Sequence, residues 1–170
     1  AQQLTNAIDA VAIACDQLNI DIEVRIVGDG AGWDVASQKV KELALPVTML
    51  HHIPPRDLAQ HYEWADTVLV HLAAWESLKA TVPSKTYELM ELGKHITVVA
   101  DGEASDLVGK LGAGVSVPAG DPHALAQAWF KLYCNRHLLS VSEEGRRWVL
   151  EQREAITPKV LRLVVEEVAN

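Results

Sequence analysis

The sequence is poor in aromatic side chains and in cysteine. Its 170 residues include five tryptophans, three tyrosines and one phenylalanine, so the core must consist mostly of Val, Leu, Ile and Ala. The two cysteines, Cys15 and Cys134, lie far apart inside predicted helices, a spacing that fits neither a disulfide framework nor a metal site. We therefore expect two core thiols in a protein of a reducing compartment.

Excess positive charge and long apolar runs are also missing. The formal net charge is -8 and the pI about 5.3, which argues against a general nucleic-acid-binding surface. No apolar run approaches the ~20 residues of a membrane helix, and residues 1–20 show neither the basic start nor the cleavage site of a signal peptide. We expect a cytoplasmic protein without a nucleic-acid partner, whose full-length form can still associate peripherally with the inner face of a membrane.

Short apolar runs alternate with amphipathic segments along the whole chain. The predicted strands are 22–27, 46–50, 67–72, 95–100 and 114–117. The predicted helices are 3–18, 33–44, 55–65, 84–92, 103–111, 121–134, 141–154 and 157–168. This alternation predicts one α/β domain over residues 1–170, with a Rossmann-like parallel sheet and helices on both faces in three layers. The strands are continuous apolar runs, as burial on both faces requires.

The chain begins with a predicted helix rather than a strand. In the usual doubly wound order the first strand lies at the centre of the sheet. Without it, a gap would separate the strands at 22–27 and 67–72. Either a strand from upstream fills this gap, or the sheet closes in another way, and the sequence leaves both open.

Ligands of open parallel sheets bind beyond the carboxyl ends of the strands, and the segment 81–88 follows such an end. Ser84 precedes a predicted helix whose free N–H groups and dipole suit a phosphate, and Lys85 adds a cation. Glu88, one turn further on, can accept hydrogen bonds from a ribose diol. The alternative is that Ser84 only caps the helix and that Lys85 and Glu88 form a surface pair worth about 0.2–0.5 kcal/mol.

Three other strand ends carry weaker signals. Residues 28–32 read Gly-Asp-Gly-Ala-Gly, which lacks the spacing of known phosphate loops and favours a tight strand-to-helix turn. His51 and His52 are adjacent in an extended segment, so they should point to opposite faces and chelate poorly. Residues 101–103, Asp-Gly-Glu, favour a helix N-cap.

The segment 81–88 reads Thr-Val-Pro-Ser-Lys-Thr-Tyr-Glu. It is followed by Asp-Gly-Glu-Ala-Ser-Asp-Leu-Val from residue 101 and Gly-Ala-Gly-Val-Ser-Val-Pro-Ala-Gly-Asp-Pro from residue 112. These blocks resemble the C-terminal, donor-binding domain of retaining group 1 glycosyltransferases of the GT-B architecture. The similarity is greatest to bacterial enzymes of polysaccharide and cell-envelope synthesis, and it covers nearly the whole chain.

The resemblance implies a role for each site residue. Glu88 would bind the donor ribose, Ser84 and Lys85 would lie near the diphosphate, and the backbone around Ile53 would meet the base. Gly28 and Gly30 would border the cleft. Further contacts to the diphosphate or sugar would come from Thr81, Pro83 and Thr86.

The implied activity is transfer of a hexosyl or N-acetylhexosaminyl group from a UDP-sugar to an acceptor hydroxyl, without a metal or other cofactor. An N-terminal domain outside this sequence would bind the acceptor glycan or lipid-linked glycan, so residues 1–170 alone should be inactive. Many relatives carry a second glutamate eight positions before the ribose glutamate, where this chain has Ala80; Glu76 lies too far back to replace it. Two alternatives remain: a non-catalytic nucleotide-binding domain derived from such an enzyme, and a fragment of a dinucleotide-dependent oxidoreductase.

Overall fold

The computed structural model describes residues 3–159. Its strands are β1 (Val24–Val27), β2 (Val47–Leu50), β3 (Val68–His71), β4 (Ile96–Val99) and β5 (Gly114–Val117). Its α-helices are α1 (Leu4–Asp16), α2 (Trp33–Glu42), α3 (Pro55–Trp64), α4 (Ser84–Glu91), α5 (Glu103–Lys110), α6 (Pro122–Cys134) and α7 (Glu143–Glu151). Shorter helical turns are η1 (Glu76–Leu78), η2 (Arg136–Leu139) and η3 (Gln152–Ile156).

All strand pairs within the described residues are parallel, but they form two separate groups. β1 pairs with β2, with Val24 opposite Val47. β4 lies between β3 and β5, with Ile96 opposite Val68 on one side and Gly114 on the other. β1 and β3 do not pair with each other, so the predicted gap lies where the sequence placed it.

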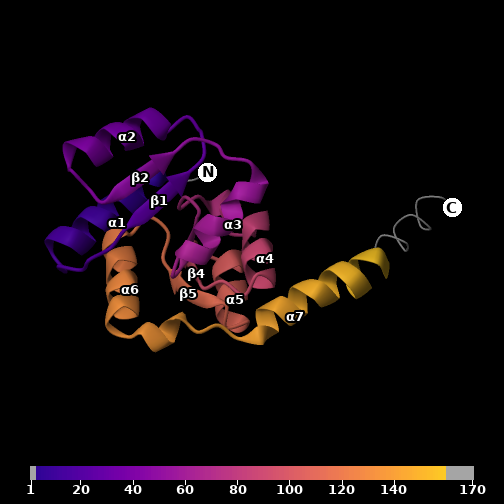
Figure 1. The fold of residues 1–170 in the computed structure, drawn as a ribbon. Coiled ribbons are helices and arrows are strands. Elements are labelled where there is room, and N and C mark those ends of the chain that lie inside the picture. The colour runs from indigo at the N-terminus through magenta and orange to yellow at the C-terminus, as the bar shows by residue number, and fades with distance from the viewer. Residues whose placement is uncertain (1–2, 160–170) are drawn as a thin grey trace.

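Helices cover both faces of the β3–β5 group. Ile96 and Val98 of β4 belong to a core cluster with α4 and α5, whereas Val99 belongs to a second cluster with α1 and α6. Because neighbouring strand residues point to opposite faces, this division shows two helical layers around one strand layer. Figure 1 shows α1 and α6 together on one side and α4 and α5 on the other. The Rossmann-like, three-layer α/β/α fold expected from the sequence is confirmed.

Helix boundaries follow local sequence signals. Proline at the start of α3 suits a position whose N–H would have no helical partner. Gly93, directly after α4, has φ +66, a left-handed conformation that ends a helix at little cost for glycine. α7 begins with Glu143 and Glu144, and Ser142 caps it by accepting from the N–H of Glu144.

Two expectations about the helices are wrong. Cys134 is exposed and Cys15 is half-buried, so they are not a pair of core thiols; Cys134 is the last residue of α6, where the helix leaves the core. The break expected between 154 and 157 is absent, because α7 continues through η3 to residue 159 in helical conformation. Most of the helix expected at 157–168 lies outside the described residues.

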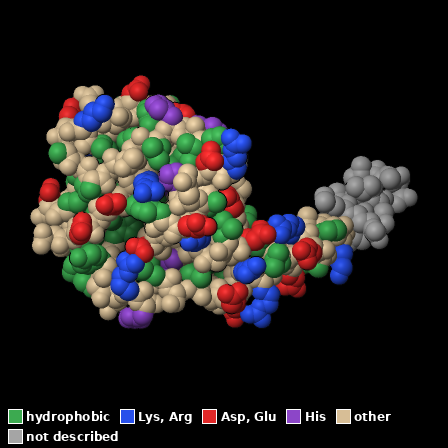
Figure 2. Space-filling view, viewed as in Figure 1, with side chains coloured by type: hydrophobic (Ala, Val, Ile, Leu, Met, Phe, Trp, Pro, Cys, Tyr) green, Lys and Arg blue, Asp and Glu red, His purple; other side chains and the backbone are tan. Residues whose placement is uncertain are grey.

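The C-terminal helical segment extends away from the body of the domain (Figure 1). Basic and acidic side chains alternate along it in Figure 2. Arg153 forms two hydrogen bonds with Glu91 at 2.7 and 2.9 Å and so ties the segment to α4. Over residues 3–159, none of the helices is long and apolar enough to cross a membrane.

Candidate functional site

The N-cap residue of α4 is Pro83, not Ser84. Pro83 is the N-cap residue, with φ -60 and ψ 139, and Ser84 is the first residue of the helix. The alternative in which Ser84 caps the helix is therefore wrong, because its backbone is already helical. Thr86 donates its N–H to Pro83 at 2.9 Å, but no acceptor within residues 3–159 takes the N–H of Ser84 or Lys85. These two groups are free to bind an anion.

A tyrosine from α3 connects the two charged residues of α4. The ammonium of Lys85 donates to the Tyr62 hydroxyl at 2.9 Å, and this hydroxyl donates to Glu88 Oε1 at 3.2 Å. The ammonium also lies 5.4 Å from the centre of the Tyr62 ring. Lys85 and Glu88 do not form the direct surface pair of the alternative interpretation. Tyr62 is buried, so the network is anchored in the core.

The other three residues expected at this site, Thr81, Pro83 and Thr86, differ in burial. Thr81 and Pro83 are half-buried at the helix start, beside Ser84. Thr86 is completely buried, and its Oγ1 has no hydrogen-bond partner within the described residues. Its side chain therefore faces the core rather than an open cleft. The free oxygen marks a buried polar atom whose hydrogen-bonding capacity is unused.

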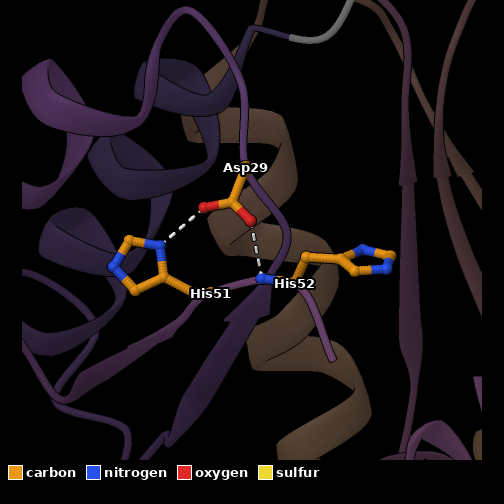
Figure 3. A network of polar contacts seen from close by, with 3 residues as sticks. All are labelled: Asp29, His51 and His52. Atoms are coloured by element: carbon orange, nitrogen blue, oxygen red, sulfur yellow. Dashed lines mark hydrogen bonds and ion pairs between the residues drawn. The ribbon is translucent and has the colours of Figure 1, made fainter. Parts of the chain in front are cut away.

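Asp29 organises the carboxyl ends of β1 and β2. Its carboxylate binds Nδ1 of His51 at 2.6 Å and accepts the backbone N–H of His52 at 2.7 Å, so it clamps the loop that leads to Ile53 (Figure 3). The hydrogen bond from His51 and that from His52 lower the pKa of Asp29 below its usual value. The His51 ring also lies 4.9 Å from the ring of Trp33.

The histidine pair behaves as its position in the chain predicts. The two rings point away from each other in Figure 3, so they do not form a chelating pair. Within residues 3–159, no group of three or more His, Cys, Asp or Glu side chains is placed to hold a metal ion. Gly28 and Gly30 lie in the neighbouring turn, where a Cβ on either would meet no atom within 4 Å. The backbone of this turn is therefore accessible.

The loop at 101–103 has a structural role. The N-cap of α5 is Gly102, with φ +79, rather than Asp101. A Cβ on Gly102 would lie 2.4 Å from the carbonyl oxygen of Lys79, which accepts the N–H of Glu103 at 2.8 Å. The residue therefore has to be glycine for this close approach.

The segment before α4 contains the position where relatives of the resembled family carry a second glutamate. Ala80 is exposed, and Glu76, at the start of η1, forms an exposed ion pair with Lys79 at 2.7 Å. Glu76 is thus engaged with its own turn.

Sequence reasoning missed Tyr62 and Asp29 as members of the site. Tyr62 is 26 positions from Glu88, and Asp29 is 22 positions from His51, so no local pattern joins them. One signal for Tyr62 was present: Leu58 and Tyr62 are four residues apart in a predicted helix, which places an aromatic hydroxyl on the buried face.

The fold and the site define a class of protein: a Rossmann-like domain that places an ammonium group, free backbone N–H groups and a carboxylate at the carboxyl end of its parallel strands. The sequence model for the family described as "Glycosyl transferases group 1" matches residues 1–148. The chain belongs to this family. No protein among those with curated descriptions matches it.

Several solved structures share the fold. Anabaena HepE, solved with UDP and glucose, is 19% identical with a TM-score of 0.73, over 99% of this chain and 45% of that one. A glycosyltransferase from Rickettsia africae is 16% identical with a TM-score of 0.74, over the same shares. A sucrose-phosphate synthase from Thermosynechococcus elongatus is 20% identical with a TM-score of 0.63, over 94% and 49%. This chain spans about half the length of these proteins.

Proposed function

We propose that this domain holds the nucleoside diphosphate part of a UDP-sugar, in a retaining GT-B glycosyltransferase that transfers the sugar to an acceptor hydroxyl. The observation that carries the proposal is the Lys85–Tyr62–Glu88 network at the start of α4. It sets a cation and a carboxylate acceptor one helical turn apart, the order in which a nucleoside diphosphate presents its phosphate and its ribose diol. HepE, which shares the fold, was solved with UDP and with UDP-glucose.

Each group has a distinct role in this proposal. The free N–H groups of Ser84 and Lys85, with the Lys85 ammonium, bind the diphosphate and stabilise its charge as the bond to the sugar breaks. Glu88 accepts from the ribose hydroxyls through Oε2, which has no partner within residues 3–159, while Tyr62 holds Oε1. The loop clamped by Asp29 presents the backbone of Ile53 to the base. These groups supply the positive charge, so the proposal requires no metal.

The whole protein supplies what this domain lacks. A second domain would bind the acceptor, a glycan or a lipid-linked glycan of bacterial polysaccharide or cell-envelope synthesis, at the cytoplasmic face of a membrane. The transferred group is a hexosyl or N-acetylhexosaminyl unit. Sugar transfer by residues 1–170 alone would contradict this division of labour.

One observation favours a second candidate, a nucleotide-binding domain without catalysis. Ala80 offers no carboxylate to the donor sugar, and Glu76 is paired with Lys79. If this candidate is correct, the full-length protein binds UDP with the same dependence on Glu88 but releases no UDP from UDP-sugars in the presence of acceptors.

Nucleotide binding tests the proposal directly. We expect UDP to raise the melting temperature of the protein more than ADP or NAD, since a ligand that binds only the native state stabilises it. Replacing Glu88 by Ala removes charged hydrogen bonds worth about 1.5–3 kcal/mol, so UDP affinity should fall about 10- to 100-fold by calorimetry. Tyr62→Phe should cause a smaller loss, because it frees Glu88 and Lys85 without removing them.

The matched control is Glu63→Ala, an exposed glutamate next to Tyr62 on α3. It should leave UDP affinity unchanged. Failure of both UDP and GDP to bind the full-length protein would refute the donor site. Selective stabilisation by NAD would instead support the oxidoreductase alternative.

A further inference from the structure

Trp75 is the most exposed of the five tryptophans, with 53% of its surface accessible to solvent. Trp64 follows at 39%, and its ring is covered in part by the guanidinium of Arg25. Within residues 3–159, no aromatic ring or cation packs on the ring of Trp75. A large ring left in water forgoes the stabilisation that burial gives, so its place in the fold decides whether a ligand can use it.

The loop that carries Trp75 crosses the carboxyl end of the β3–β5 group. Trp75 comes four residues after the last residue of β3. A Cβ on Gly120, in the loop after β5, would lie 3.5 Å from the Cβ of Ala74. The carbonyl of Lys79 accepts the N–H of Glu103, in the segment after β4, at 2.8 Å. Trp75 therefore lies at the end of the sheet where ligands of parallel sheets bind.

Hydrogen bonds on both sides of Trp75 hold its backbone in place. Its N–H donates to the carbonyl of Ala73 at 2.8 Å, and its carbonyl accepts the N–H of Leu78 at 2.9 Å. The carbonyl of Leu78 in turn accepts the N–H of Thr81 at 3.0 Å, and the side chain of Leu78 packs against the core. A ring on a loop that is already ordered loses less conformational freedom when a ligand binds.

Charged groups from two neighbouring loops accompany the ring. The ammonium of Lys79 pairs with Glu76 Oε2 at 2.7 Å. The hydrogen bond with Glu76 raises the pKa of Lys79, and the charge of Asp101 adds to this, so Asp101 lies near the same ammonium. Oδ1 of Asp101 accepts the N–H of Ala119 at 3.3 Å. Within residues 3–159, Oε1 of Glu76 and Oδ2 of Asp101 have no hydrogen-bond partner.

This combination of groups matches the chemistry of a sugar ring. A pyranose carries C–H groups on its faces and hydroxyls around its edge. The face of a tryptophan suits the C–H groups, and carboxylates and an ammonium form strong, charge-assisted hydrogen bonds with hydroxyls. A protein partner would require a wider apolar patch. The exposed neighbours of Trp75 are instead small or charged, namely Ala74, Glu76, Lys79 and Ala80.

We propose that Trp75, Glu76, Lys79 and Asp101 form a binding subsite for one pyranose unit. The ring of Trp75 packs against a C–H face of the sugar, and the three charged groups bind its hydroxyls. The inference deepens the proposed transferase function and rests on it, because the sugar belongs either to the donor or to the acceptor glycan. The subsite lies on the loop before α4, whereas the proposed contacts to the diphosphate and ribose lie on α4 itself.

Fluorine NMR of the full-length protein, labelled with fluorotryptophan, tests the subsite. The signal of Trp75 is assigned by its loss in Trp75→Phe. The probes are UDP, three UDP-sugars (glucose, galactose and N-acetylglucosamine) and the methyl glycosides of the same sugars and of mannose. The glycosides are added with UDP at tens of millimolar, since contacts to a single sugar give dissociation constants of about a millimolar or weaker.

At least one sugar-bearing probe should shift the Trp75 signal, and UDP alone should not. The signal of Trp64 should stay unchanged, because Trp64 ends α3 just before β3 and so lies at the amino end of the strand. A shift with a UDP-sugar but with no glycoside identifies the donor as the source of the sugar. A shift with a glycoside in the presence of UDP identifies the acceptor.

Variants test whether the ring itself binds the sugar. Trp75→Ala should weaken the affinity for the responding sugar by at least about 5-fold and leave the affinity for UDP unchanged. Trp75→Phe keeps an aromatic ring and should recover part of the loss. The matched control is Trp64→Ala, an exposed tryptophan at the opposite end of the sheet, which should leave the affinity for the sugar unchanged.

The outcomes separate this inference from the proposed function. If UDP does not bind the wild-type protein, the proposed function fails. If UDP binds but no sugar-bearing probe shifts the Trp75 signal, only the subsite fails. Unchanged sugar affinity in Trp75→Ala would also overturn it. So would shielding of the Trp75 signal from a water-soluble paramagnetic agent without sugar, because another part of the protein would then cover the ring.

Discussion

β4 and β1 are both four-residue parallel strands, but their surroundings differ. Every residue of β4 is buried, whereas β1 has three half-buried residues and one exposed residue. β4 has a strand on each side and a helical layer on each face. Within residues 3–159, β1 has one strand partner, and it lines a cavity of about 640 Å³ that separates it from β3. Apolar sequence alone does not bury a strand, because burial also requires neighbours at both edges.

The largest effect should come from replacing a glycine of β5, in contrast to a glycine of the turn after β1. A Cβ on Gly114, the first residue of β5, would lie 1.9 Å from the carbonyl oxygen of Ile96, and its φ is +158. Gly114→Ala should therefore reduce the free energy of unfolding by about 3 kcal/mol or more. Gly30→Ala, in the turn after β1, meets no atom within 4 Å and should change it by less than about 0.5 kcal/mol. Equal effects in urea unfolding would contradict the comparison.

Truncation of strand side chains tests the same difference in packing. Val98→Ala in β4 removes two methyl groups from a fully buried position and should cost about 2 kcal/mol. Val27→Ala in β1 should cost less than about 1 kcal/mol, because its side chain is half-buried and lines the cavity between β1 and β3. Equal costs at the two positions would contradict the comparison.

Burial of His71, the last residue of β3, makes stability depend on pH. Burial lowers the pKa of His71 from its ordinary value of 6.5 to about 4. The unfolded chain binds a proton at His71 more readily than the folded chain does. The free energy of unfolding is therefore at its full value above pH 6.5 and decreases as the pH falls toward 4. We expect about 2 kcal/mol of stability to disappear in this window. His71→Gln should unfold with a correspondingly weaker pH dependence, measured by denaturant unfolding at pH 7 and 4.5; identical slopes would refute the assignment.

The smallest effect concerns a contact between β1 and α3. The guanidinium of Arg25, on β1, lies 3.8 Å from the centre of the Trp64 ring, at the end of α3. Since Arg25 is exposed, Arg25→Ala should cost only about 0.5–1 kcal/mol in thermal unfolding. Arg25→Lys, which keeps the charge, should recover part of that loss, and a full loss with Lys would point to packing instead.

Much of the fold follows from local pattern. The five strands and the first six helices lie where apolar periodicity predicts them, with ends shifted by a few residues, because the first and last residues of an element depend on caps and neighbours. The break expected between residues 154 and 157 was wrong because no proline or glycine lies at residues 152–157. Cys134 was misplaced because helical periodicity does not show where a helix leaves the core.

The candidate site was predictable only along one element. Ser84, Lys85 and Glu88 are neighbours on α4, so their spacing could be read from the chain, and their roles as donor contacts stay predictions. The partners Tyr62 and Asp29 could not, because they come from α3 and from the turn after β1. Contacts between elements depend on how helices pack on the sheet, and a single sequence does not encode that packing locally.

By itself, the sequence determined the α/β class and the order of elements, and it predicted the gap between its first and third strands, since these depend on periodicity and on the topology of parallel sheets. Only the tertiary structure decided that Tyr62 joins Lys85 to Glu88, that Asp29 holds the loop after β2, and that β1 and β3 face each other across a cavity. Each of these depends on distances between segments far apart in the chain, which hydrophobic packing sets only when the whole domain has folded.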